Sequence, residues 1–557
     1  MPHFTTKQGA LFYCYAIDVE QTAKIDKFLK ILEDSGVAEI IDRVFVEKDF
    51  GRPGLNPYLL FAAIVYGFAF GSPTLRELET SCAYDVRFMY ITNGVQPDHS
   101  SFSRFINKVI KPYTDEIFSK VTKAYLKFCQ ITNEECHIDG TKFEARPNKY
   151  KVVWKPTTFH TKLCGKVRTL LKNLSLDASV PDNDIFPSIL IANKLHEAED
   201  LPRPENIKEC KILDTKLENL EGYLFKALEY EEKEAICGVN RNSYYKTDHD
   251  ATAMCLKEDY YSGLGSNLHA AYQMQTVVSH GFVVSYYVSQ DRTDVYTFIP
   301  TLNRFHEMYG CYPKRITADA GYGCKDNYKF CRDNNIEAFI KYQNWTGEAS
   351  GRRPTTYELQ PDGLIKCVNG IIGQRVELKD RHHKIKNGSF FRVICPKNCP
   401  FMTYCRRYMK ELTGSEKIFE VDTEYQKLKQ EARDRLLSPK GIEMRINRSC
   451  QIEGVYGIEK YNMSYGRIRR VGISRVKTEY MLTILGLNTR KLFRVFDGRT
   501  NLNYWKAPEG LQPEKFKKPS AKRLTARVLK KKTAQPNEIA KNSYKNKYKS
   551  TKSKGCQ

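Results

Sequence analysis

Two stretches decide the fold prediction: CHIDGT at residues 136–141 and RITADAGYG at residues 315–323. In each, an apolar or β-branched run ends in an aspartate, Asp139 or Asp319, which small residues follow at once. This pattern predicts a β-strand that brings a carboxylate to the edge of a sheet and leaves space beyond it. An isolated Asp-Gly pair is more typical of a turn. Two such acids at strand ends of one sheet favour a common site.

The segments around these strands predict an α/β domain with a mixed sheet. After the strand that ends at Asp139, the pattern predicts a hairpin, a helix, a strand, a second helix and a last strand. Their ranges are 270–279 and 281–289 for the hairpin, then 295–309, 314–318, 326–334 and 337–342. Helical crossovers join the later strands, as parallel pairing requires. We therefore expect Asp139 and Asp319 to end the first and fourth strands of one sheet.

Composition divides the rest of the chain into further regions. We expect an all-α domain over residues 1–130, and a catalytic core over 131–345 and 439–495 that a helical insertion (156–246) and a β-rich basic insertion (346–438) interrupt. A lysine-rich tail over 508–557 is expected to be disordered. Short helices that carry Arg76 and Arg104 make the first region a candidate DNA-binding domain. The alternative is a helical scaffold without DNA contact.

A third acid, Glu453, lies in a helical stretch at residues 445–461. Gly454 and Gly457 each cost a helix about 1 kcal/mol, which suggests that the sheet edge or DNA approaches closely there. Lys460 is seven residues after Glu453 and so shares its helix face, where it could contact a phosphate. Glu453 could instead face solvent, and two other acids compete with it for the role: Glu443 and Glu459.

Three carboxylates from two strands and a helix predict a site for two divalent ions, Mg²⁺ or Mn²⁺. The net charge of +24 and the pI of about 9.2 favour a polyanionic partner. Together these features indicate chemistry on a nucleic-acid phosphate.

The N-terminus lacks the pattern of a secretory signal, and no apolar run approaches the roughly 18 residues of a membrane span. The seventeen cysteines are therefore expected to be reduced thiols. We expect a cytoplasmic, nucleoid-associated protein with no membrane partner.

Two smaller motifs have open interpretations. Four cysteines with irregular spacing are compatible with zinc or with buried free thiols: Cys367, Cys395, Cys399 and Cys405. Asp248 and Asp250, in a TDHDA run, could hold the site or its DNA, or could serve as helix caps or turn residues.

Several motifs together resemble bacterial insertion-sequence DDE transposases, and more narrowly the group with an InsH-like helical N-terminal domain. They are HIDGTKFEA (137–145), TDHDATAM (247–254), ADAGYG (318–323), EGVYGIEK (453–460), and, in the first domain, residues 51–79 and 97–105. The resemblance covers roughly residues 40–495. It implies a ribonuclease-H-like core, Mg²⁺ dependence, and cutting and joining of transposon-end DNA by Asp139, Asp319 and Glu453 as catalytic and metal-binding acids.

The resemblance also implies double-stranded DNA partners, namely terminal inverted repeats and target DNA, and a homodimer or higher assembly on paired ends. The sequence departs from the Tyr-x2-Arg-x3-Glu-x6-Lys signature of related transposases, because Ile446 and Ser449 replace the tyrosine and the arginine. Arg448, one position away, is the candidate substitute for a DNA contact. The alternative functions are a metal-dependent DNA nuclease without strand transfer and a non-catalytic DNA-binding protein with the same fold.

Overall fold

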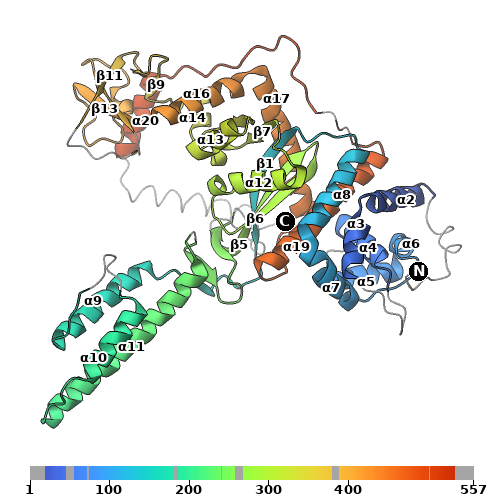
Figure 1. The fold of residues 1–557 in the computed structure, drawn as a ribbon. Helices are drawn as coiled ribbons and strands as arrows, with labels where there is room; N and C mark the ends of the chain where they lie inside the picture. The colour runs from blue at the N-terminus through green and yellow to red at the C-terminus, as the bar shows by residue number, and fades with distance from the viewer. Residues whose placement is uncertain are drawn as a thin grey trace, which may run out of the picture. The chain divides into compact units, whose positions relative to one another are not determined.

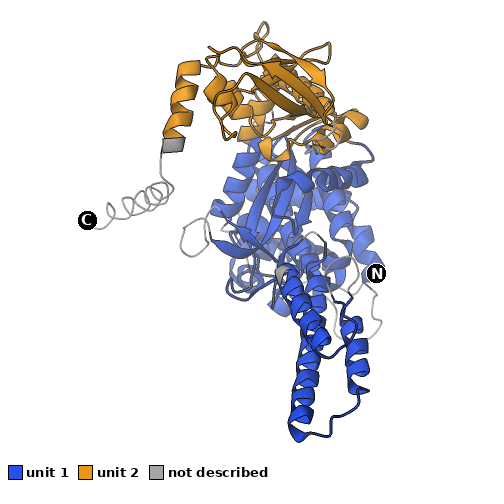
Figure 2. Ribbon diagram, turned by 90° about the vertical axis from the view of Figure 1, so that its left-hand side faces the viewer, with its two compact units in different colours: residues 1–133, 138–311, 451–503 blue, residues 134–137, 312–450, 504–557 orange. Residues whose placement is uncertain are grey.

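The computed structural model divides into two compact units (Figure 2). Unit 1 comprises Met1–Asn133, Ile138–Cys311 and Gln451–Asn503, and unit 2 comprises Glu134–His137, Tyr312–Cys450 and Tyr504–Gln557. The residues that the structure describes are 19–45, 55–71, 74–179, 186–239, 241–256, 267–378, 385, 388–463, 465–500, 502 and 504–533.

Unit 1 begins with a set of helices, as the sequence predicts for the N-terminal region (Figure 1). The Asn56 side chain caps the helix that starts with Pro57 by accepting from the amides of Tyr58 and Leu59. A capping box of Thr74 and Glu77 starts the next helix. The helices are α2 (Val19–Asp34), α3 (Val37–Val44), α4 (Pro57–Phe70), α5 (Leu75–Tyr84), α6 (Val86–Ile91), α7 (His99–Phe105) and α8 (Thr114–Phe128), with η1 (Ile106–Ile110) and η2 (Lys111–Tyr113) before α8.

Helix α4 is apolar on all sides because it is buried against α19 (Ile473–Phe496). The two helices approach closely at Gly486, where an added Cβ would lie 2.5 Å from the carbonyl carbon of Phe68 and 2.6 Å from its oxygen. Nearby, Tyr66 and Phe70 pack edge-on against Phe493. The N-terminal helices and the late helix α19 thus share one core.

Replacing Gly486 by alanine is expected to lower the free energy of unfolding by about 1–3 kcal/mol, because the new methyl group forces the α4 backbone away. Urea denaturation followed by circular dichroism measures the change. The matched control is Gly222→Ala in a long helix, where nothing among the described residues lies within 4 Å of the added carbon. That change should be neutral or stabilising by up to about 1 kcal/mol, and equal effects of the two changes would contradict the close packing.

The main sheet is mixed and six-stranded, in the order β4-β5-β1-β7-β8 with β6 paired to β5. Strand β1 pairs in parallel with β7, and β7 with β8, whereas β4, β5 and β6 pair antiparallel. His280 and Gly281 join β5 to β6 with positive φ angles of 51° and 77°, which confirms the predicted hairpin. The strands are β1 (Glu135–Glu144), β4 (Thr252–Cys255), β5 (Leu268–Ser279), β6 (Phe282–Ser289), β7 (Arg315–Ala318) and β8 (Glu337–Ile340).

Two details of the sheet differ from the sequence prediction. Asp139 does not end its strand, because β1 continues to Glu144, and the Ala145 amide still donates to the Ala270 carbonyl at 2.7 Å. The strand continues because its far end pairs with β5 after its pairing with β7 has ended at His137. In addition, β4 was not predicted, so the strand before Asp319 is the fifth of this sheet along the chain.

Helices connect the later strands as expected. Helix α12 (Phe298–Tyr309), preceded by η3 (Asp294–Tyr296), packs against β5 and β6 in unit 1. In unit 2, η4 (Ala320–Tyr322) and α13 (Lys325–Asp333) link β7 to β8. A mixed α/β fold with parallel strands is therefore confirmed, whereas its assignment to the ribonuclease-H-like class stays a prediction.

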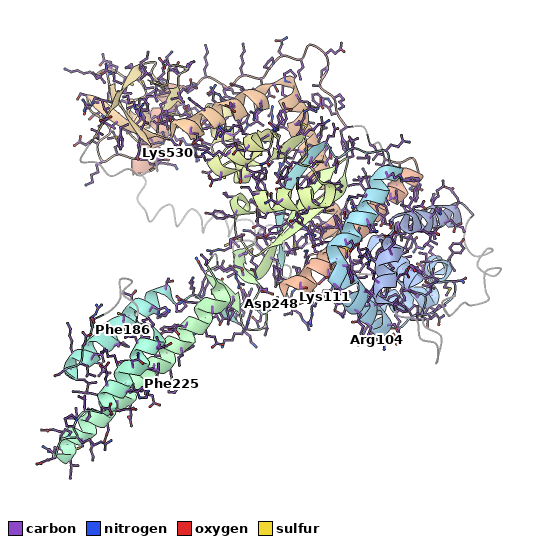
Figure 3. All side chains as sticks on the ribbon, viewed as in Figure 1. Arg104, Lys111, Phe186, Phe225, Asp248 and Lys530 are labelled. Carbon is purple, nitrogen blue, oxygen red and sulfur yellow. The ribbon has the colours of Figure 1, made fainter. Side chains whose placement is uncertain are left out.

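The helical insertion has its own apolar core. Strands β2 (Val152–Trp154) and β3 (Ser243–Tyr245) pair at its base, and they flank α9 (Thr157–Asn173), α10 (Ser188–Glu199) and α11 (Ile207–Cys237). Phe186 is buried among these helices, whereas Phe225 on α11 is exposed (Figure 3).

In unit 2, the predicted β-rich insertion contains a five-stranded antiparallel sheet in the order β13-β12-β11-β10-β9. Buried residues such as Ile365, Phe391 and Phe419 form its core. Its strands are β9 (Tyr357–Leu359), β10 (Ile365–Cys367), β11 (Ile372–Val376), β12 (Ser389–Ile394) and β13 (Glu416–Val421). The unit's remaining helices are α14 (Trp345–Ala349), α15 (Met402–Cys405), α16 (Thr423–Leu437), α17 (Pro439–Arg448) and α20 (Ala521–Thr533).

Helix α20 lies within the tail that the sequence predicts to be disordered. It forms because Leu524 and Val528, one turn apart, are buried against Tyr404. Residues 534–557 of the predicted tail lie outside the described residues.

Within the described residues, no single helix is long and apolar enough to cross a membrane, and only the sharply bent pair α4 and α5 meets the length and composition test when taken together.

Candidate active site

Asp139 lies partly buried in β1, within unit 1. Its Oδ1 accepts a hydrogen bond of 2.9 Å from the Gly140 amide, which fixes the orientation of the carboxylate. A Cβ on Gly140 would lie 2.6 Å from Oδ1 of Asp294 and would overlap the amide of Gln275. The glycine after Asp139 is therefore needed for close packing of polar side chains on this side of the sheet.

Asp294 is a neighbouring acid that the sequence interpretation missed. It begins η3 and accepts hydrogen bonds from the side-chain amides of Gln273 and Gln275 on β5. A local signal was present, because Asp294 follows the buried strand β6 by only a few residues, as Asp319 follows β7. The carboxylate orders the two glutamines beside Gly140.

A late helical segment is joined to β1 at Asp139. The Tyr456 hydroxyl donates to the Asp139 carbonyl oxygen at 2.7 Å, so its oxygen accepts the hydrogen bond from the Thr276 hydroxyl, also 2.7 Å. Lys460 Nζ donates to Thr141 Oγ1 at 2.6 Å and lies 5.0 Å from the centre of the Phe143 ring. Tyr456 and Lys460 follow Glu453 by three and seven residues, so the segment that carries Glu453 is attached to the strand that carries Asp139.

This segment contains two short π-helices, η5 (Ser449–Glu453) and η6 (Ile458–Asn462), on either side of α18 (Gly454–Gly457). Single π-turns within α-helices occur frequently at functional sites. Glu453 is the last residue of the first π-turn.

The structure distinguishes the three candidate glutamates by their surroundings. Glu453 is exposed, whereas Glu443 is buried in unit 2, where it accepts from Lys440 Nζ at 2.7 Å and from the Ala507 amide at 3.0 Å. Glu459 is buried in unit 1, and neither of its carboxylate oxygens has a hydrogen-bond partner among the described residues. Burial raises the pKa of Glu459 to about 8, with Lys460 opposing the rise. Glu453 is thus the acid of the three that is open to a ligand.

Gly454 and Gly457 do not face the sheet edge. Nothing among the described residues lies within 4 Å of a Cβ added at either position. The sequence analysis suggested that either the sheet edge or DNA approaches these glycines closely. Within the described part of the chain, the sheet edge does not approach them.

Asp319 lies in unit 2 and is partly exposed. Its Oδ1 caps the following turn η4 by accepting from the Gly321 amide at 2.7 Å. A Cβ on Gly323 would lie 2.7 Å from the Cα of Tyr342, which explains the second glycine of the ADAGYG motif. Each aspartate thus has one oxygen bound by a backbone amide, and both offer the hard oxygen donors that Mg²⁺ prefers.

Asp139 and Glu453 lie in unit 1 and Asp319 lies in unit 2. No three His, Cys, Asp or Glu side chains within the described ranges are gathered as ligands of one metal ion. The metal-binding role of the three acids stays a prediction.

The residues predicted to bind DNA are dispersed. Arg76 on α5 and Arg104 on α7 are exposed, and Arg104 is seen near the end of its helix (Figure 3). Lys460 is bonded to β1 as described, and Arg448 is partly buried at the end of α17 in unit 2. Their contacts with DNA stay predictions.

The cap interpretation of Asp248 and Asp250 is confirmed. Asp250 Oδ2 accepts from the Ile473 amide at 2.8 Å, and Asp248 Oδ1 accepts from the Gly472 amide at 3.3 Å, so both acids bind the start of α19. Asp248 also accepts from the Tyr272 hydroxyl at 2.9 Å.

The four cysteines considered for zinc line one small cavity of about 20 Å³ in unit 2. Lys417 Nζ lies 3.2 Å from the Cys405 sulfur, and burial raises the pKa of the Cys395 and Cys399 thiols. These cysteines are not disulfide-bonded and do not form a metal-ligand group among the described residues. Zinc binding stays a prediction.

Two family models match the chain. Residues 15–108 match a family described as Transposase domain (DUF772), and residues 367–493, which include Glu453, match one described as Transposase DDE domain. Comparison with curated proteins and with solved structures gave no match. The chain therefore combines a DUF772 transposase domain with a transposase DDE domain, an arrangement typical of insertion-sequence transposases.

Proposed function

We propose that this protein cleaves DNA at transposon ends and transfers the cut strands to target DNA, with Asp139, Asp319 and Glu453 as its catalytic acids. The attachment of the Glu453 segment to β1 at Asp139, through Tyr456 and Lys460, is the observation that carries the proposal. These hydrogen bonds hold the segments that carry Asp139 and Glu453 together within unit 1.

The register between β1 and β7 supports Asp319 as the third catalytic acid. His137 of β1 is the parallel partner of Thr317 of β7. Asp139 lies two residues after His137, and Asp319 lies two residues after Thr317. A step of two along an extended strand keeps a side chain on the same face, so each aspartate lies on the face of the paired residue before it.

The acids fit divalent metal ions in their chemistry. Mg²⁺ or Mn²⁺, when bound, would supply an activated water and stabilise charge on the reacting phosphate. Asp139 and Asp319 are oriented beforehand, because backbone amides already bind one oxygen of each carboxylate. Such orientation reduces the entropy that a reacting complex must lose.

The surface beside Glu453 suits a DNA backbone. Gly454 and Gly457 expose main chain without a protein neighbour among the described residues. A net charge of +24 attracts the polyanion. Because transposition joins two ends, we propose that the protein acts as a dimer or higher assembly on transposon-end and target DNA.

The test is a strand-transfer assay with purified protein, Mg²⁺, pre-cut duplexes that carry the element's ends, and a supercoiled target plasmid. We expect joined products that appear only when the end sequence and the metal are both present. Cleavage of DNA without joined products would assign a nuclease instead, and binding without either reaction would assign a non-catalytic DNA-binding protein.

A further inference from the structure

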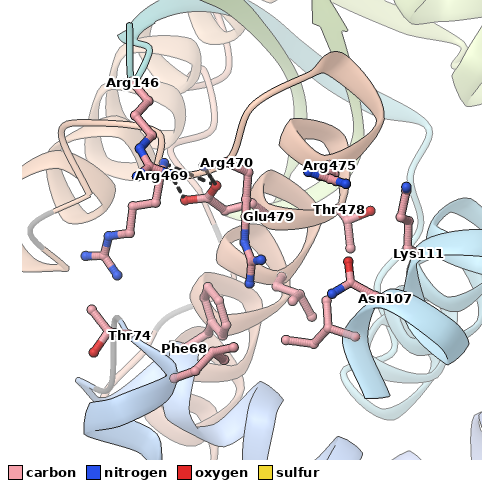
Figure 4. A pocket seen from close by; sticks show the side chains of 13 residues that line it. Phe68, Thr74, Asn107, Lys111, Arg146, Arg469, Arg470, Arg475, Thr478 and Glu479 are labelled. Atoms are coloured by element: carbon pink, nitrogen blue, oxygen red, sulfur yellow. Dashed lines mark hydrogen bonds between the residues drawn. The ribbon is translucent and has the colours of Figure 1, made fainter. Parts of the chain in front are cut away.

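A basic pocket lies in unit 1 between the N-terminal helices and the start of α19 (Figure 4). Its cavity has a volume of about 270 Å³. Phe68, Thr74 and Asn107 line the side formed by α4 to η1. The charged residues around the cavity are five cations and one acid: Lys111, Arg146, Arg469, Arg470, Arg475 and Glu479.

The single acid of the pocket binds the backbone and not the arginine side chains. The Glu479 carboxylate accepts from the Arg469 amide at 3.1 Å and from the Arg470 amide at 2.9 Å (Figure 4). Burial raises the pKa of Glu479, while these two amides oppose the rise. Glu479 therefore determines the path of the chain that carries the two arginines.

Two more carboxylates hold the next residues of the same loop. Asp248 binds the Gly472 amide and Asp250 binds the Ile473 amide, as described above. Three buried or partly buried acids thus bind four of the five backbone amides between residues 469 and 473. The loop is held rigidly, and its acids are occupied by main-chain groups.

None of the five cations of the pocket forms a close ion pair in the part of the chain that the structure describes, and the Glu479 carboxylate acts on Arg469 and Arg470 only through longer-range attraction. No carboxylate there lies within 4 Å of the side-chain nitrogens of Lys111, Arg146, Arg469, Arg470 or Arg475. Like charges this close repel one another, and an anion in the cavity removes that repulsion.

We propose that this pocket binds a backbone phosphate of duplex DNA. Arginine forks match phosphate oxygens with paired hydrogen bonds, and a loop that is held in advance loses little entropy on binding. DNA is the polyanion that the proposed function supplies, and the assignment of the ligand rests on that function. The lining of the pocket includes residues from both matched family regions, and three of its cations, Arg469, Arg470 and Arg475, lie in the region 367–493.

A contact of this kind positions DNA and does not read its sequence. Removing it weakens binding to every duplex by a similar factor. It also makes the dependence of affinity on salt less steep, because fewer counterions are released when DNA binds.

The test is the double variant Arg470→Gln/Arg475→Gln in the full chain, with binding to a fluorescent duplex measured by anisotropy over a range of salt concentrations. We expect Kd to rise by at least about tenfold at low salt, and the slope of log K against log salt to fall in magnitude by about 2, one for each lost contact. A duplex with transposon ends and an unrelated duplex should lose the same factor.

The matched control is Lys166→Gln/Lys172→Gln, which removes the same charge from exposed positions on α9. Its Kd and salt slope should remain those of the unaltered protein. The variant Arg470→Lys/Arg475→Lys keeps the charge and should recover most of the salt slope, and equal melting temperatures exclude a folding defect.

The outcomes separate the pocket from the proposed function. Duplex binding by the unaltered protein that the glutamine variant leaves unchanged overturns the pocket alone. No duplex binding by the unaltered protein overturns both. Competition by inorganic phosphate at concentrations equal to those of DNA phosphate would assign the pocket to a free anion and overturn the DNA assignment.

Discussion

Replacing Asp319 by asparagine should reduce strand cleavage and strand transfer by about 10³-fold or more, which corresponds to about 4 kcal/mol of transition-state stabilisation. The reason is the loss of one negative charge and one metal ligand at the proposed site. DNA binding should change little. The amide oxygen of the new side chain can still accept from the Gly321 amide, so the turn that Asp319 caps is kept. Asp139→Asn should behave alike, because the Gly140 amide keeps its acceptor.

The measurement pairs the strand-transfer assay with duplex binding and circular dichroism on the same preparations. The matched control is Asp326→Asn, which removes an exposed acid from α13 in the same unit as Asp319. It should leave the rates unchanged. Full activity of Asp319→Asn, with binding and folding intact, would show that the proposed site is wrong.

Glu459→Gln should make the protein more stable at pH 8 and should have much less effect at pH 5. In the folded state, burial raises the pKa of Glu459 from 4.5 to about 8. Between these values the unfolded chain has released the proton while the folded chain retains it. Unfolding is therefore favoured as pH rises, by up to about 1.4 kcal/mol per pH unit from this group. Glutamine removes that dependence.

Urea denaturation of the two proteins at several pH values between 4.5 and 8 gives the difference in unfolding free energy. Burial also raises the pKa of Glu479, but this group is present in both proteins and cancels in the comparison. Glu205→Gln, at an exposed position, is the control and should give no difference that varies with pH. A constant difference for Glu459→Gln across the range would mean that the Glu459 carboxyl is ionised in the folded state.

Elements with strong local signals were predicted well. The hairpin that turns at His280 and Gly281 and the helix expected over 295–309 both depend on residues within a few positions of one another. The short strand β4 lacked such a signal, because it is a strand only through its pairing with β5. Helix α20 was missed for a related reason, since its few apolar residues are buried through packing against Tyr404 and Phe401, far away in the sequence.

The candidate site was predicted in part. The motifs identified Asp139, Asp319 and Glu453 as candidates, and the helical spacing placed Lys460 on the same face as Glu453. Asp294 was not identified, because its place beside Gly140 results from contacts between β1, β5 and η3. The same holds for the choice among the three glutamates, since exposure of Glu453 and burial of Glu443 and Glu459 depend on packing.

Composition and short-range spacing were enough to predict the strands and helices with clear periodicity, the basic character of the chain and the acids of the transposase motifs. Three other features became visible only in the folded chain: Asp250 caps a helix 223 residues away, burial raises the pKa of Glu459, and five cations surround one cavity. Burial and charge pairing depend on which distant segments pack together, and short-range spacing does not encode that.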